Sequence, residues 1–175
     1  MKNRFIVKGS ETTILLNRND GSVLETFIDT RDLPLATNFP NTWYASWNPP
    51  TQSFYVYGKQ SLNGRRKTVQ LHRWLTSTPD ISEVDHVNLD TLDNRRSNLR
   101  IASSAENAQN KRVNRRNNKS GYRGVSWCNT NRKWIAQVMV DRKNKFLGYF
   151  DEKHVAGRIA AEARAVMMPY SKEAT

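Results

Sequence analysis

Cysteine, long apolar runs and acidic residues are all scarce in this chain. Cys128 is the one cysteine among 175 residues, so an internal disulfide and a cysteine-based zinc site are both excluded. No run of about 18 apolar residues exists, so the sequence predicts no membrane span. The first residues lack the apolar core of a signal peptide. These absences fit a reducing compartment, and we expect a cytoplasmic protein.

Basic residues outnumber acidic ones by 28 to 16, which gives a net charge of +12. The excess is uneven. Residues 107–150 hold eleven Lys or Arg and one acid, Asp141, so ten of the twelve net charges fall there. The rest of the chain is nearly neutral. Such a concentration points to a polyanionic partner, with nucleic acid as the first candidate and an anionic membrane surface as the second.

The first 65 or so residues are expected to form short β-strands, because β-branched and aromatic residues cluster there between turn signals. Asn19-Asp20-Gly21 is one such signal. A short helical turn is expected at 29–33. The expected strands cover residues 5–7, 13–16, 23–28, 43–47 and 53–57.

A helix is expected over residues 68–75, where apolar side chains recur at helical spacing. His72 lies on it, and we favour a buried histidine that supports the next segment over a directly catalytic one. Residues 83–100 are expected to form two short extended pieces around a long loop. Ser103 and Glu106 have the spacing of a capping box, so another helix is expected to begin there.

The C-terminal part alternates strand-like runs with turns and then becomes rich in alanine. Strands are expected at 122–127, 133–140 and 145–150. Asp151 is expected to cap a helix that reaches Ala165. Small side chains let such a helix lie close on a sheet, so the sequence predicts a three-stranded sheet packed on one helix.

Asp85 and His86 stand side by side, followed by Asn98 after thirteen residues and Asn107 after twenty-two. A carboxylate and an amide oxygen can hold a hard divalent ion against a phosphate, and a histidine can take a proton from water near neutral pH. Neighbouring side chains on a strand point to opposite faces. A bulge or a strand end is therefore needed for Asp85 and His86 to serve one site.

We interpret Asp85 and Asn107 as ligands of one Mg²⁺ or Mn²⁺ ion, and His86 as the base. Asn110, one helical turn beyond Asn107, is an alternative ligand. The other interpretation is structural, with Asp85 capping a turn and Asn98 tying down loop backbone. For Asn98 we favour this loop-positioning role.

Four pieces of sequence together resemble the HNH nucleases of the ββα-metal fold. They are Leu71-His72-Arg73, Val84-Asp85-His86, Asn94…Asn98-Leu99-Arg100 and Glu106-Asn107. The resemblance covers about residues 65–112. Its closest branch is the phage homing endonucleases, in which asparagine replaces the last motif histidine. The protein would then act in the cytoplasm of a host cell.

This resemblance implies metal-dependent hydrolysis of DNA. Asp85 and Asn107 would share one metal, His86 would be the general base, and Asn98 would position the loop. The chain departs from the common form in one place, because Leu89 stands where that form has glycine.

A second resemblance covers about residues 120–168, to the plant APETALA/ethylene-response-factor DNA-binding domain. It is carried by the Ala-rich helix and by Tyr122-Arg123-Gly124-Val125, Lys133-Trp134-Ile135-Ala136 and Phe146-Leu147-Gly148-Tyr149-Phe150. That family lays a three-stranded sheet in the DNA major groove. Gln137 and Met139 replace the usual Glu and Arg, and Phe146 replaces a Trp, so base specificity does not transfer.

Five residues are candidates for DNA binding under this resemblance. Arg123 and Trp134 match contact positions of the family, and Trp127, Arg132 and Lys145 are suitably placed. For Trp127 and Trp134 the alternative is packing on the sheet. For the arginines the alternative is a solvated face, against which the concentration of charge argues.

The sequence therefore predicts an α+β protein with a nuclease domain over 1–113, in which a β-rich part at 1–65 precedes a ββα core at about 66–112. A basic linker at 114–120 and a DNA-binding domain at 121–175 follow. We expect a monomer that acts on double-stranded DNA, by a nick or a double-strand cut, and has no membrane partner. The alternatives are a non-catalytic DNA-binding regulator with a decayed site and, less favoured, an RNA-directed nuclease.

Overall fold

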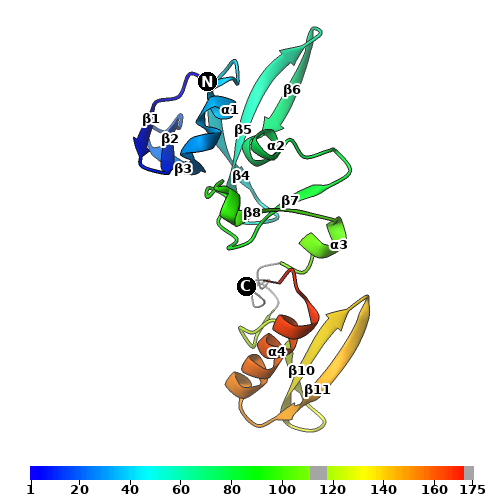
Figure 1. Ribbon diagram of the computed structural model, residues 1–175. Coiled ribbons are helices and arrows are strands. Elements are labelled where there is room, and N and C mark those ends of the chain that lie inside the picture. Colours follow the sequence, from blue (N-terminus) through cyan, green and yellow to red (C-terminus); the bar gives the residue numbers. More distant parts are fainter. Residues whose placement is uncertain (111–117, 172–175) are drawn as a thin grey trace. The chain divides into compact units, whose positions relative to one another are not determined.

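A computed structural model describes residues 1–110 and 118–171 (Figure 1). The chain divides into two compact units, Met1–Ser104 and Ala105–Thr175. The predicted boundary between 113 and 114, and most of the predicted linker, lie outside the described residues. Both units mix small sheets with helices, which confirms the predicted α+β class. Within the described ranges, no helix is long and apolar enough to span a membrane.

The first unit begins with a three-stranded antiparallel sheet. Its strands are β1 (Phe5–Lys8), β2 (Glu11–Asn17) and β3 (Val23–Asp29), with β2 in the centre. The predicted turn joins β2 to β3. A 3-10 turn, η1 (Thr30–Asp32), leads into the short helix α1 (Leu33–Thr37), which starts with a proline in its first turn.

A second antiparallel sheet follows, in the order β4 (Trp43–Asn48), β5 (Ser53–Leu62) and β6 (Arg65–Gln70). The helix predicted to start at residue 68 is wrong at its beginning. β6 continues to Gln70, and α2 runs only from Leu71 to Thr76. The β-branched residues Thr68 and Val69 pair across the strands with β5 instead.

The remaining sheet of the first unit is a hairpin of β7 (Glu83–His86) and β8 (Leu99–Ala102). A long loop joins them and ends in the 3-10 turn η2 (Arg96–Asn98). This confirms the two extended pieces around a loop. The helix after them, α3 (Ser104–Asn107), is a single turn and is shorter than expected.

The first unit has an aromatic and aliphatic core. Phe39 and Trp43 stack with ring centroids 4.0 Å apart, and Trp74 packs edge-on against both. Gly58 of β5 is required beside them, because a Cβ there would lie 2.4 Å from the Phe39 ring. The fully buried core also includes Ile14, Leu16, Ile28, Ala36, Val56, Leu71 and Leu75.

The second unit contains a sheet in the order β11-β10-β9 with one long helix beside it (Figure 1). Its elements are β9 (Val125–Cys128), β10 (Lys133–Val140), β11 (Lys143–Phe150) and α4 (Lys153–Met167). The predicted three strands and helix are present. The predicted cap is wrong, because the N-cap residue is Glu152.

Small side chains let α4 approach this sheet closely. Ala156 and Ala160 pack against Val125 and Ala136 in the core of the second unit. Gly157 fits under the ring of Tyr122, where a Cβ would come within 2.3 Å of a ring carbon. Asp151 does not cap the helix. It forms an ion pair with Lys133, with Asp151 Oδ1 3.2 Å from Lys133 Nζ.

Candidate active site and nucleic-acid interface

Asp85 and His86 occupy the last two positions of β7, and both are buried, at 5% and 4% exposure. The strand ends at His86, which meets the expectation that a strand end is needed for both to serve one site. Asp85 lies opposite Arg100 on β8. The Arg100 Nε and Nη2 atoms both donate to Asp85 Oδ2, at 2.9 and 2.7 Å. The carboxylate is therefore held in position by a charged neighbour.

His86 sits in an aromatic and amide environment contributed by other elements. The rings of His72 on α2 and Tyr55 on β5 meet it edge-on, with centroids 5.1 and 6.0 Å away. Asn94 Oδ1 lies 3.4 Å from His86 Nε2. Burial lowers the pKa of His86, and the contact with Asn94 opposes that shift. The net effect keeps the imidazole neutral near pH 7.

Asn94 connects His86 to the first sheet through a chain of hydrogen bonds. The Thr26 hydroxyl donates to the Leu92 carbonyl at 2.6 Å, so its oxygen accepts from Asn94 Nδ2 at 2.8 Å. This fixes the orientation of the amide and turns Oδ1, an acceptor, toward His86. An acceptor in this position favours the tautomer that has its proton on Nε2. We assigned no role to Asn94 from the sequence, although it lies within the motif.

The loop between β7 and β8 is tied together by Asn98. Its Oδ1 accepts from the Asn88 backbone N–H at 2.8 Å, and its Nδ2 donates to the Asp93 carbonyl at 2.7 Å. Its own carbonyl accepts from Val87 N–H at 2.9 Å. Leu89, at the position of the family's glycine, adopts a left-handed backbone with φ of 66°. The loop thus keeps a conformation that favours glycine without having one.

Two arginines attach the end of this loop to the N-terminal sheet region. Arg96 donates from Nε and Nη2 to the two carboxylate oxygens of buried Asp32, each at 2.9 Å. Arg95 pairs with Asp93 at 2.7 Å and with Glu11 at 2.8 Å. The strands that precede the motif therefore hold the motif loop in place.

His72 is buried at 4% exposure beneath the candidate base. Burial, with the nearby His86 and Arg73 as smaller causes, lowers its pKa to about 3. An imidazole with a pKa this low binds a proton too weakly to be an effective general base near pH 7.

Asn107 and Asn110 belong to the second compact unit, whereas Asp85 and His86 belong to the first. The pairing of Asp85 with either asparagine on one metal stays a prediction. In the described parts of the chain, no group of three or more His, Cys, Asp or Glu side chains could hold a metal ion. One carboxylate with one amide oxygen suits a hard ion that keeps water and phosphate ligands, and does not suit structural zinc.

The predicted DNA-binding residues of the second unit lie in different environments. Arg132 and Lys145 are exposed, and Arg123 donates to the Gln109 carbonyl at 2.6 Å. Trp134 packs against the core beneath α4, which favours the packing alternative for it. Trp127, 46% exposed, meets the Trp134 ring edge-on at 5.1 Å.

The register of the sheet places another set of side chains on the face opposite α4. Ala136 and Val138 are buried under the helix, so the alternate residues of β10 face away. The exposed side chains Met139, Phe146 and Tyr149 lie on that outer face or its edge, and the last two meet with centroids 5.0 Å apart. Sequence reasoning treated Met139 and Phe146 only as departures from a family.

Comparison with known proteins bears on one part of this arrangement. Residues 77–109 match a family model described as HNH endonuclease. The matched segment includes β7, the motif loop, β8 and α3, and it supports an HNH nuclease domain in this part of the chain. The HNH segment ends before the C-terminal sheet. Searches of curated proteins and of solved structures find no match to the chain.

Proposed function

We propose that this protein is a DNA endonuclease of the HNH homing type, phage-borne, that hydrolyses a phosphodiester with one divalent metal ion. The observation that carries the proposal is the position of Asp85 and His86 at the end of β7, within the segment that matches the HNH endonuclease model. The second unit serves to hold duplex DNA.

His86 is the general base in this proposal. A base must be neutral before it accepts a proton, and burial lowers the pKa of this imidazole. The Thr26–Asn94 chain supports the tautomer with its proton on Nε2, and in this proposal His86 takes the proton of the water that attacks the phosphorus. His72 acts as a neutral packing partner and Asn98 as the clasp of the loop.

Asp85 and Asn107 are the proposed metal ligands, with Mg²⁺ or Mn²⁺ as the ion. A bound ion would stabilise negative charge on the phosphate and on the leaving 3′ oxygen. Arg100 holds Asp85 Oδ2 through two donors. These two hydrogen bonds orient the carboxylate.

The second unit is the proposed main source of DNA affinity. Exposed Arg132 and Lys145 provide charge for the phosphates, and the outer face of the sheet provides Met139 and Phe146 for contacts within the groove. Met139 stands where the plant family has Arg, so the base preference of that family does not transfer to this sheet.

Incubation of supercoiled plasmid that carries candidate targets with Mg²⁺ tests the nuclease proposal. We expect wild type to convert it to nicked or linear DNA, and His86→Ala to lose at least about 100-fold in rate while it binds the same DNA. Equal cutting by both proteins would refute the assignment of His86. If wild type cuts no member of a library of random targets, the nuclease proposal is refuted.

One observation favours the alternative of a non-catalytic DNA-binding protein. Arg100 already pairs with Oδ2 of Asp85, one of the two oxygens that could bind a metal. If this pairing excludes metal, Mg²⁺ or Mn²⁺ will not change the affinity for DNA or the thermal stability. On the nuclease proposal, Mn²⁺ raises the melting temperature of wild type and has less effect on Asp85→Asn.

A further inference from the structure

The hairpin of β5 and β6 extends beyond the sheet to which it belongs. β4 pairs with β5 only as far as Gly58, and the strands then continue as a two-stranded ribbon from Lys59 to Thr68. Figure 1 shows the pair running away from the other elements of the first unit. Asn63 and Gly64 form the tip, both with positive φ, as a two-residue turn requires.

The ribbon carries positive charge without compensation. Lys59, Arg65, Arg66 and Lys67 fall within nine residues that contain no acid, and all four are exposed. Their cross-strand partners are neutral, since Arg66 faces Ser61 and Lys67 faces Gln60. An isolated ribbon of this length is only marginally stable in water, and like charges close together weaken it further.

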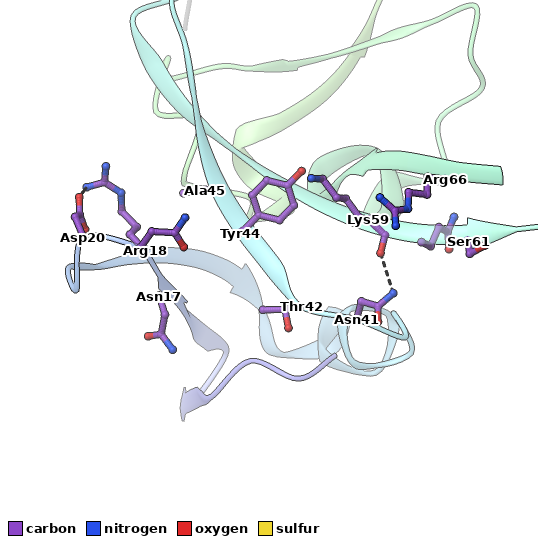
Figure 2. A pocket seen from close by; sticks show the side chains of 12 residues that line it. Asn17, Arg18, Asp20, Asn41, Thr42, Tyr44, Ala45, Lys59, Ser61 and Arg66 are labelled. Atoms are coloured by element: carbon purple, nitrogen blue, oxygen red, sulfur yellow. Dashed lines mark hydrogen bonds and ion pairs between the residues drawn. The ribbon is translucent and has the colours of Figure 1, made fainter. Parts of the chain in front are cut away.

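One face of the ribbon forms a wall of an open basic pocket of about 910 Å³ (Figure 2). Lys59 and Arg66 line it from the ribbon and Arg18 from the turn after β2, with Tyr44 between them. Asp20 is the one acid in the lining, and it pairs with Arg18 at 2.8 Å. The pocket is polar, and a phosphate group is the kind of ligand that its cations would accept.

We propose that the β5–β6 ribbon is a second DNA-binding element, which lies in a groove of duplex DNA while the pocket beside it takes a backbone phosphate. A two-stranded ribbon fits the major groove, and Arg and Lys on it can reach phosphates on either side. Leu62, 57% exposed near the tip, supplies an apolar contact of the kind made to a thymine methyl. In this proposal the first unit binds duplex DNA directly, in addition to the second unit.

Duplex DNA fits this surface better than the other polyanions do. A-form RNA has a major groove that side chains cannot enter, and an anionic membrane needs no projecting ribbon. The inference rests on the proposed function only for the identity of the partner. It concerns binding, so it can fail while the nuclease proposal survives.

The test is equilibrium binding of the full chain to duplex DNA, without divalent ions, over a range of salt concentrations. Arg65→Thr, Arg66→Thr and Lys67→Thr are combined in one variant, because threonine keeps the strand propensity. If each cation neutralises one phosphate, the slope of log affinity against log salt becomes shallower by about 2 to 3. We also expect binding at least about tenfold weaker at low salt.

The control variant removes the same charge elsewhere in the first unit, by Arg4→Thr, Lys8→Thr and Arg31→Thr, all exposed residues. It should keep the wild-type slope to within about one unit. Arg65→Lys with Arg66→Lys should also bind as wild type, which separates lost charge from a lost fold. Circular dichroism checks that each variant is folded.

Three results would overturn the inference: a wild-type slope in the ribbon variant, an equal loss in the control, or a loss confined to duplex RNA or to vesicles with anionic lipid. The same ribbon variant is assayed for plasmid cutting at low salt and saturating protein. If the ribbon variant still cuts the plasmid and binds DNA as wild type does, the ribbon proposal fails and the nuclease proposal survives. If wild type does not cut and the ribbon variant binds DNA more weakly, the nuclease proposal fails and the ribbon proposal survives.

Discussion

The first unit buries polar side chains around β7 and β8, whereas the second unit exposes the cations Arg132, Lys143 and Lys145 on or beside a small sheet. Asp85, His86, Asn94 and Asn98 are all buried, and each has hydrogen-bonding or ionic partners that fix its orientation. Chemistry at a phosphate needs groups held in one geometry, and binding to a polyanion needs accessible charge. The contrast is consistent with the proposal that the first unit cuts DNA and the second unit holds it.

The two cores differ as well. Large aromatic and aliphatic side chains fill the first, while alanine and a close-fitting glycine dominate the second. A core of large side chains can carry the cost of many buried polar groups, because each large side chain buries more apolar area. The ribbon complicates the division, since it gives the first unit exposed charge of its own.

The largest expected effect comes from removing an aromatic ring of the first core. Trp43 is fully buried, stacks on Phe39 and donates from Nε1 to the Ala36 carbonyl at 3.2 Å. We expect Trp43→Ala to lower the unfolding free energy of the first unit by about 3–5 kcal/mol. Denaturant titration followed by NMR peaks of each unit measures this. The second unit should be unchanged, and an equal loss in both would contradict their separation.

A smaller effect is expected on catalysis when His86 loses its amide partner. Asn94→Ala should lower kcat by about 10- to 100-fold with little change in KM, as removal of a group that orients a functional imidazole does. The ¹⁵N shifts of His86 should show a mixture of tautomers in place of one. Thr26→Val, which removes the hydroxyl that fixes the Asn94 amide, should act in the same direction and less strongly. Unchanged shifts in both variants would exclude this role.

The first unit should lose stability in acid because His72 is buried in its neutral form. Its folded-state pKa is about 3, below the ordinary value of 6.5, so the unfolded chain binds a proton that the folded chain does not. The stabilisation is complete above about pH 6.5 and is lost as the pH falls toward 3. Between pH 7 and pH 5 we expect a loss of about 2 kcal/mol from this residue.

Urea unfolding at the two pH values measures that loss. In His72→Phe the difference between pH 7 and pH 5 should shrink by about the same amount, leaving the part that His86 contributes through its own lowered pKa. An undiminished pH dependence in this variant would show that His72 takes up a proton freely in the folded protein.

The smallest expected effect is a gain in stability from the motif loop. Leu89 has a left-handed backbone conformation, which costs a non-glycine residue about 1–2 kcal/mol. Glycine would avoid this cost, but it loses more conformational entropy on folding, so the gain is partly cancelled. Leu89→Gly should therefore stabilise the first unit by up to about 1 kcal/mol without reducing cleavage. Differential scanning calorimetry measures the change. A destabilised protein would mean that the leucine side chain contributes more by packing than its backbone costs.

Much of the fold could be predicted from local pattern. The alternating and β-branched runs located β1 to β4, and the turn signals and alanine-rich segment located the strands and helix of the second unit. The prediction failed at residues 68–70, where an apolar stripe at helical spacing competed with a strand. The pairing of Thr68 and Val69 with β5 decided that segment, and pairing between distant residues is not visible in a local window.

The candidate site shows the same limit. Spacing pointed to Asp85, His86 and Asn98, and the family match covers them. The part that Asn94 plays could not be predicted, because it depends on Thr26, 68 residues earlier in the chain. The ribbon had a local signal, because Asn63-Gly64 lies between β-prone residues. Its four cations were missed because the charge was summed over the whole first part of the chain, where acidic residues elsewhere balance them.

By itself the sequence determined the α+β class, the concentration of charge after residue 107 and the residue types at the motif. These follow from composition and from short-range periodicity. Only the tertiary structure decided that the Asn94 amide lies against His86, that Arg100 holds Asp85, and that Trp134 faces the core while Met139 faces out. Each of these depends on contacts between residues that the chain brings together only when it folds.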